Sequence, residues 1–184
     1  MTARPSGAHP SSVRSPEARP PLATRGLTEV SEAVSVACPP DAFWAWFVAA
    51  PLPDLLPGGG GLPGVVGTEA LNEWPWGRVG AARRVRLGDG TSVIEAVTEA
   101  DPPRSLAYQV WGFAGVSALL VEQARGRFAF AEDGAGTRIV WSYAFAPRHA
   151  ALRPLVALFA RRRFAAFMRA GLAAMAARAP APAS

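Results

Sequence analysis

The chain has 184 residues, of which 50% are hydrophobic and 18% are charged, a composition typical of one globular domain with a single core. The formal net charge is +5, but the excess arginine is concentrated near the N-terminus and at residues 161–163, without interleaved aromatic residues, so we expect no nucleic-acid partner. The single cysteine, Cys38, excludes an intramolecular disulfide and a cysteine-rich metal cluster.

The N-terminus has no apolar stretch of the kind that a secretory signal requires, and no apolar run approaches the length of a membrane span. The sequence therefore predicts a cytoplasmic protein without stable membrane insertion. Residues 1–27 are rich in Pro, Ser, Ala and Arg without a hydrophobic period, so we expect a disordered tail there and another at 179–184. A single domain is expected over 28–178.

The domain begins with residues 28–38, which alternate like a strand. Pro39, Pro40 and Asp41 then indicate the start of a helix, with Asp41 as the expected N-cap, and Pro51 ends this helix. A loop rich in glycine and proline follows.

Six strand-like segments come next, each bounded by turn residues, and they predict a meander of antiparallel hairpins. These segments are residues 65–74, 80–87, 91–99, 105–113, 119–131 and 137–145. From His149 to Arg178 there is no proline after Pro154, and the composition favours one long helix. This order of elements indicates an α+β fold in which the long helix covers one face of a curved sheet.

Residues 77–110 read GRVGAARRVRLGDGTSVIEAVTEADPPRSLAYQV and residues 136–147 read GTRIVWSYAFAP, followed by the terminal helix. Together they resemble the polyketide cyclase/dehydrase branch of the START and birch-allergen-like (SRPBCC) superfamily over roughly residues 30–178. The resemblance implies a helix-grip fold, in which the sheet wraps the long helix and leaves an apolar cavity between them. It also implies a hydrophobic small-molecule ligand, such as a lipid, sterol, polyketide or quinone, and only some members of the superfamily are enzymes.

The hairpin over residues 82–97 admits two registers. A two-residue turn would place Glu95 outside beside Arg84, whereas a three-residue turn over 88–90 with a bulge would align Arg83 with Glu95 on the inner face. The second register gives the cleaner apolar face. It also agrees with the next hairpin, in which a four-residue turn pairs Glu95 with Val110. We therefore expect Arg83 and Glu95 to point inward.

The last hairpin sets a second inner row. A turn over residues 133–136 pairs Phe130 with Ile139 and Phe128 with Trp141. The residues that then share the inner face are Phe128, Phe130, Ile139, Trp141, Tyr143 and Phe145, and counting back in twos adds Glu122.

These registers predict an apolar cavity with a few polar groups, as in most small-molecule sites. The candidate catalytic residues are Glu95, Glu122 and Arg83. The expected ligand-binding residues are Tyr108, Val110, Phe128, Phe130, Trp141, Tyr143, Trp74 and Trp76. Only His9 and His149 are available as histidine ligands, so we expect no metal and no other cofactor.

The function that these groups suggest is the binding of a polyketide, lipid or isoprenoid-like molecule, with cyclisation of a poly-β-ketone as the candidate reaction. Glu122 or Glu95 would remove a proton, and Arg83 or Tyr108 would stabilise the enolate oxygen. The alternative is a carrier protein in which no bond changes.

Each residue also has a structural interpretation. Arg83 and Glu95 could form only a cross-strand ion pair, and Glu122 could lie in solvent at a strand end. The large aromatic residues could be core packing. Trp74 and Trp76 could form a rim over the cavity or pack on the long helix.

Overall fold

Seven antiparallel strands form one sheet in the order β1-β7-β6-β5-β4-β3-β2 in the computed structural model, which describes residues 18–181. The strands are β1 (Thr28–Val36), β2 (Val65–Ala70), β3 (Ala82–Leu87), β4 (Ser92–Asp101), β5 (Ser105–Trp111), β6 (Val121–Asp133) and β7 (Gly136–Pro147). Strands β2 to β7 follow one another as hairpins, and β1 pairs with β7. The predicted meander is confirmed.

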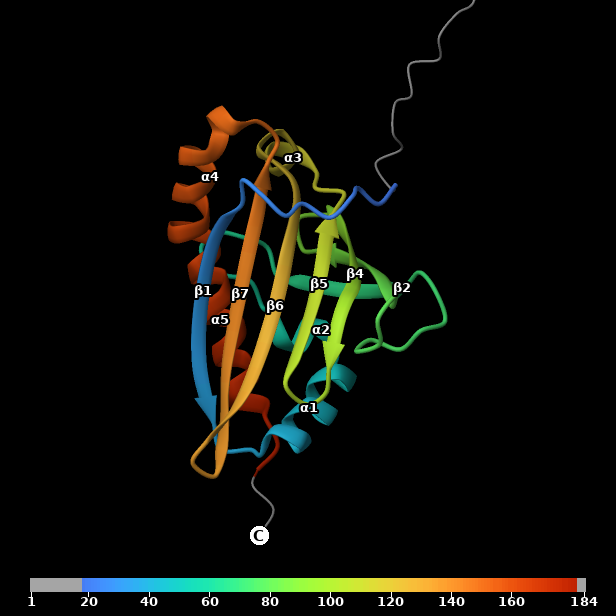
Figure 1. Ribbon diagram of the computed structural model, residues 1–184, viewed down its shortest axis with the longest axis vertical. Helices are drawn as coiled ribbons and strands as arrows, with labels where there is room; N and C mark the ends of the chain where they lie inside the picture. Colours follow the sequence, from blue (N-terminus) through green and yellow to red (C-terminus); the bar gives the residue numbers. More distant parts are fainter. Residues whose placement is uncertain (1–17, 182–184) are drawn as a thin grey trace, which may run out of the picture.

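The C-terminal helix covers one face of this sheet, as the sequence predicts. It starts with a 3-10 turn, Ala150–Leu152, and continues as α4 (Arg153–Phe159), a π-helical segment (Ala160–Phe164) and α5 (Ala165–Arg178). Figure 1 shows α4 and α5 running along β1 and β7, with α3 (Gly115–Leu120) at the end near α4. The α+β helix-grip fold is therefore confirmed. No helix within residues 18–181 is long and apolar enough to cross a membrane.

Two short helices, α1 (Pro40–Ala49) and α2 (Leu52–Leu55), precede the meander. The N-cap of α1 is Pro39, not the expected Asp41, which lies in the first turn without capping the helix. Proline fits at the following position because the first helical N–H has no partner within the helix. The apolar side of α1 fills the space above β6, where the Phe43 and Phe47 rings pack 5.4 Å from the ring of Phe130.

Residues 18–27, which we expected to belong to a disordered tail, lie across the outer face of the sheet (Figure 1). Gln109 and Gln123 hold this segment: their side-chain amides donate to the carbonyls of Pro20 and Pro21 at 2.9 and 2.7 Å. Arg19 Nε in turn donates to Gln109 Oε1 at 2.7 Å. Prolines cannot donate, but their carbonyls satisfy two glutamine amides. Residues 1–17 and 182–184 of the expected tails lie outside the described residues.

Candidate functional site

The β3–β4 hairpin adopts the bulged register. Arg83 lies opposite Glu95, and the Leu87 N–H donates to the Thr91 carbonyl at 2.9 Å, so the turn comprises residues 88–90. Gly90 in this turn has a φ of 83°, which a glycine adopts without strain. The expected inward position of Arg83 and Glu95 is confirmed, since both line the space between the sheet and the helices.

Arg83 and Glu95 form an ion pair with an uneven geometry. Arg83 Nε and a terminal guanidinium nitrogen both donate to Glu95 Oε2, at 3.0 and 2.9 Å. Within residues 18–181, no group donates a hydrogen bond to Oε1 of Glu95. The two side chains are only 15% and 10% exposed. The pair therefore lies at a sheltered site, with one carboxylate oxygen left for another donor.

The ring of Trp76 stacks on the guanidinium of Arg83, whose central carbon lies 3.4 Å from the ring centroid. Trp76 lies in the loop between β2 and β3 and also contacts the edge of Tyr108, with ring centroids 6.1 Å apart. A guanidinium so close to an indole face gains a cation–π attraction. Trp76 and Glu95 thus fix the orientation of Arg83 from two sides.

Tyr108 lies beside Glu95 with its hydroxyl oriented by Trp141. The indole Nε1–H of Trp141 donates to the Tyr108 hydroxyl oxygen at 3.0 Å. Because an indole can only donate, the phenolic proton of Tyr108 is left to donate to another group. Burial, and secondarily the negative charge of Glu95, raises the pKa of Tyr108 well above its usual value, so the hydroxyl stays protonated.

Tyr143 completes the group. Burial raises its pKa well above the ordinary range, and the charges of Tyr108 and Glu95 act in the same direction. The ring of Tyr143 packs against that of Tyr108, with centroids 6.2 Å apart, and both tyrosines line the same cavity as Glu95. Three polar groups from β4, β5 and β7 therefore converge on one region instead of being scattered around the wall.

These groups line a cavity of about 420 Å³ between the sheet, the C-terminal helix and α3, a size within the range of small-molecule sites. A second chamber of about 20 Å³ lies beside it, with Arg83 and Trp76 in its wall, and has room for about one water molecule. Leu56, Glu95, Tyr108 and Trp141 line both spaces. The polar groups thus lie where the two spaces meet.

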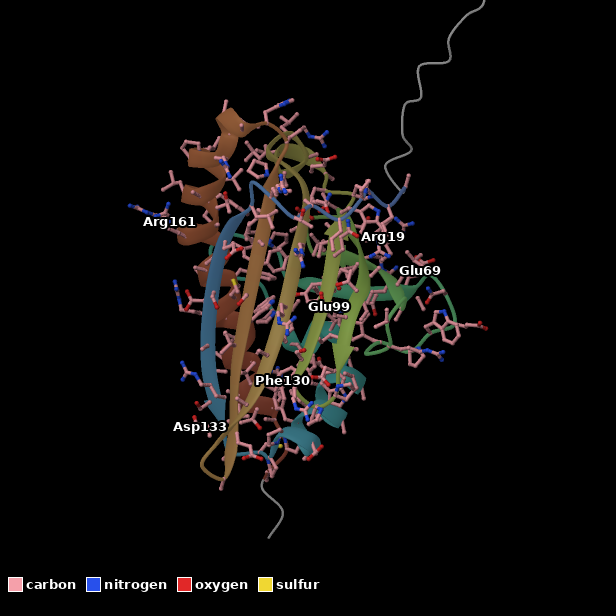
Figure 2. All side chains as sticks on the ribbon, in the orientation of Figure 1. Arg19, Glu69, Glu99, Phe130, Asp133 and Arg161 are labelled. Atoms are coloured by element: carbon pink, nitrogen blue, oxygen red, sulfur yellow. The ribbon has the colours of Figure 1, made fainter. Side chains whose placement is uncertain are left out.

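The apolar ligand-binding candidates divide between these spaces. Val110 and Tyr143 line the large cavity, Phe128 lines the small chamber, and Trp141 lines both. Phe130 is buried but packs on α1 and lines neither space, and Figure 2 shows it at that end of the sheet. The sequence identified its inner face correctly but not the helix that covers it.

Trp74 is not a wall residue of either space. Its side chain is 39% exposed and lies under the guanidinium of Arg78, 3.6 Å from the ring centroid. Trp76, two residues later in the same loop, is the tryptophan that reaches the site.

Glu122 does not take the inner position that counting back in twos predicts, but the alternative position in solvent. A register shift between Val121 and Gln123 interrupts the pairing of β6 with β7. Because the extra residue breaks the two-residue alternation, Glu122 is exposed and Val121 takes the inner position on the cavity wall. Glu122 is therefore not a candidate base.

Two further features of the site were missed. Gly126 on β6 lies opposite Tyr108 on β5, and a Cβ atom on residue 126 would overlap the Tyr108 ring. The pairing of a glycine with a tyrosine across the two strands is the sequence signal that could have revealed this contact. Phe159, Phe164 and Phe167 of the C-terminal helix also line the cavity. Their spacing of five and three residues brings them to one side because the π-helical segment lies between them.

Among residues 18–181 there is no cluster of His, Cys, Asp and Glu side chains suited to a metal ion. The arrangement can orient an apolar molecule and exchange a proton or hydrogen bond with its polar end, through a carboxylate oxygen and a phenol.

A family model described as polyketide cyclase / dehydrase and lipid transport matches residues 28–180. Among solved structures, Zhui aromatase/cyclase from Streptomyces sp. R1128 is 20% identical with a TM-score of 0.61, over 83% of this chain and 93% of that chain. Ginseng major latex-like protein 151 from Panax ginseng is 15% identical with a TM-score of 0.60, over 83% of this chain and 97% of that chain. The di-domain ARO/CYC BexL from the BE-7585A biosynthetic pathway is 18% identical with a TM-score of 0.61, over 84% of this chain and 50% of that chain.

A search of curated proteins found no match. At these identities the solved structures show a common fold, and together with the family match they confirm the superfamily resemblance seen in the sequence.

Proposed function

Because this chain belongs to the polyketide cyclase/dehydrase and lipid transport family, we propose that it binds a hydrophobic small molecule between the sheet and the C-terminal helix. The observation that carries this proposal is the cavity of about 420 Å³, with mostly apolar walls and the side chains of Glu95, Tyr108 and Tyr143 together in its lining. A few convergent polar groups in an apolar cavity are typical of a site that orients its ligand. A cytoplasmic location is part of this proposal.

The chemistry of the walls suggests how such a ligand would lie. Phe145, Phe159 and Phe164 line the cavity and pack on one another, and aromatic walls favour a flat or extended apolar skeleton. A hydroxyl of the ligand would donate to Glu95 Oε1. A carbonyl would accept from Tyr108, whose proton has no other partner in the described part of the chain.

A dye titration tests binding. 1-Anilinonaphthalene-8-sulfonate should gain fluorescence with the native protein, and Val110→Phe should weaken this binding at least tenfold because Val110 is 1% exposed and lines the cavity. The control is Val79→Phe, because Val79 is 55% exposed and lies outside the lining. Equal binding by both variants would contradict the proposal.

Within this function we propose cyclisation as the finer activity, with Glu95 as the base. Glu95 would take a proton from a carbon between two carbonyls of a poly-β-ketone, and Tyr108 would donate to the enolate oxygen. The enolate carbon would attack a third, more distant carbonyl of the same chain, and the alkoxide formed would recover the proton from Glu95. The free Oε1 of Glu95 and the free proton of Tyr108 favour this activity over simple transport.

A matched pair of variants separates an enzyme from a carrier. Tyr108→Phe removes only the hydroxyl, and Arg83→Met combined with Glu95→Gln removes the base without leaving an unpaired buried charge. An enzyme should keep dye binding in both variants and lose conversion of a poly-β-ketone by at least a hundredfold. If the native protein returns the poly-β-ketone unchanged, the carrier function holds.

A further inference from the structure

The outward sides of α3 and α4 carry exposed apolar side chains at one end of the molecule. Val116 and Leu119 on α3 are 72% and 69% exposed, and Leu155 and Leu158 on α4 are 48% and 53% exposed. In each helix the two residues are three positions apart and so share a face. Single exposed apolar residues are common, but a group of them on neighbouring elements indicates an interaction site.

The two helices are neighbours. The Arg148 N–H, just before the C-terminal helix, donates to the Leu120 carbonyl at 3.0 Å, and Arg148 Nε donates to the Ala118 carbonyl at 2.8 Å. Figure 1 shows α3 and α4 at the same end of the sheet. We call the outward residues Val116, Leu119, Leu155, Leu158, Arg161 and Arg162 the rim surface.

The charge around the rim surface is positive. From Arg148 to Arg178 the chain contains seven arginines and no acidic residue. Within residues 18–181, the first five of these arginines form no ion pair with a carboxylate; they are Arg148, Arg153, Arg161, Arg162 and Arg163. Three of them, Arg148, Arg153 and Arg163, donate hydrogen bonds to backbone carbonyls. Figure 2 shows Arg161 projecting away from the helix.

Three acidic residues lie near the same end. Glu122 is exposed just after α3, and Asp89 is exposed at the tip of the β3–β4 hairpin, where it lines the cavity. Glu29 is exposed at the start of β1, three residues after Gly26, whose carbonyl accepts from Arg153. The five arginines without a carboxylate partner outnumber these carboxylates, so this end of the molecule is cationic.

The rim surface adjoins the cavity. Leu120 of α3 and Phe159 of α4 line the cavity, so these helices are apolar on both the outer and the inner side. Because Val116 and Asp89 are exposed and also line the cavity, the cavity reaches the surface here.

We propose that the rim surface docks reversibly on anionic lipid bilayers and brings the mouth of the cavity to the membrane. The leucine and valine side chains would enter the boundary between headgroups and acyl chains, and the arginines would contact lipid phosphates. A bilayer suits this surface better than an acidic protein because the apolar groups project as separate side chains from two short helices. The proposal does not depend on whether the bound ligand is converted.

Sedimentation with vesicles tests this docking. The native chain should bind vesicles of phosphatidylcholine and phosphatidylglycerol, should bind pure phosphatidylcholine at least tenfold more weakly, and should be released by added salt. Arg161→Gln with Arg162→Gln should weaken binding on the order of tenfold. Leu119→Ser with Leu158→Ser should also weaken it, because less apolar area is buried.

The matched control is Val79→Ser with Arg138→Gln, which changes one exposed valine and one exposed arginine elsewhere and should leave vesicle binding unchanged. All three double variants should keep dye binding in the cavity, so a failure of docking is distinguishable from a failure of the proposed function. No binding to anionic vesicles, or equal loss in the control, would overturn the proposal. Binding to immobilised polyglutamate without binding to vesicles would overturn it in favour of an acidic protein partner.

Discussion

Arg83 directs two guanidinium N–H groups to a single oxygen of Glu95, across neighbouring strands and under the ring of Trp76. Removing one partner leaves a sheltered charge without compensation, so Arg83→Met and Glu95→Gln should each destabilise the fold by about 3–5 kcal/mol. The double variant should recover much of this loss. Denaturant unfolding of the four proteins in a double-mutant cycle measures the coupling.

Arg84 provides the comparison for this cycle. It lies on the opposite face of β3, 3.8 Å from Glu69, whose side chain is 62% exposed. The coupling of Arg84 to Glu69 should be below about 1 kcal/mol and should decrease with salt. Strong coupling of Glu95 to Arg84, with none to Arg83, would refute the inward placement of the pair.

Gly126 determines where Tyr108 can lie. In Gly126→Ala the new methyl group would overlap the Tyr108 ring, so we expect a loss of about 1–3 kcal/mol of stability together with weaker dye binding. Gly88→Ala is the control because its nearest neighbour would be at an ordinary 3.6 Å. Thermal unfolding and dye titration of both variants decide the point: an unchanged Gly126→Ala variant would mean that Tyr108 is not confined.

Because Tyr108 and Tyr143 are buried, we expect the free energy of unfolding to fall at alkaline pH. Burial raises the pKa of Tyr108 and of Tyr143, whereas in the unfolded chain both ionise near pH 10. Above this pH the folded state therefore holds more protons than the unfolded state, and stability falls by about 1.4 kcal/mol per pH unit for each tyrosine.

This titration has few competing groups because the chain contains no lysine and only these two tyrosines. Burial also raises the pKa of Cys38, so the experiment uses a Cys38→Ala background. Denaturant unfolding at increasing pH, with phenolate absorbance, should show ionisation only on unfolding, and Tyr143→Phe should halve the slope. Phenolate absorbance from the folded protein near pH 10 would contradict the burial of these hydroxyls.

Much of the fold was predictable because its determinants are local. The lengths of the turns fixed the pairing of Arg83 with Glu95 and of Phe128 with Trp141, and alternation within each strand then identified the inner face. Glu122 was misplaced because nothing in the residues around it marks the bulge in β6.

The parts of the site that could not be predicted depend on contacts between distant segments. The stacking of Trp76 on Arg83 joins a loop to a strand. Phe159 and Phe164 face the cavity only because the helix widens between them. Gln109 and Gln123 look like ordinary outer-face residues in the sequence, yet both are almost completely buried by the N-terminal segment.

That segment should contribute to stability. A chain beginning at residue 24 lacks Arg19, Pro20 and Pro21, whose hydrogen bonds satisfy the two glutamines. At about 1 kcal/mol for each bond, it should be less stable by about 2–4 kcal/mol than a chain beginning at residue 18. Denaturant unfolding compares the two chains, and equal midpoint concentrations would show that the hydrogen bonds of this segment to the two glutamines do not contribute to stability.

Native mass spectrometry of the protein purified from its own host tests most directly whether the cavity holds a hydrophobic small molecule. We expect a non-covalent complex with one organic molecule that survives gentle ionisation and is released on activation. The Val110→Phe variant, prepared in the same way, should have much lower occupancy because the larger side chain enters the cavity. A spectrum of the native protein showing only the mass of the chain, or equal occupancy in the variant, would contradict the account.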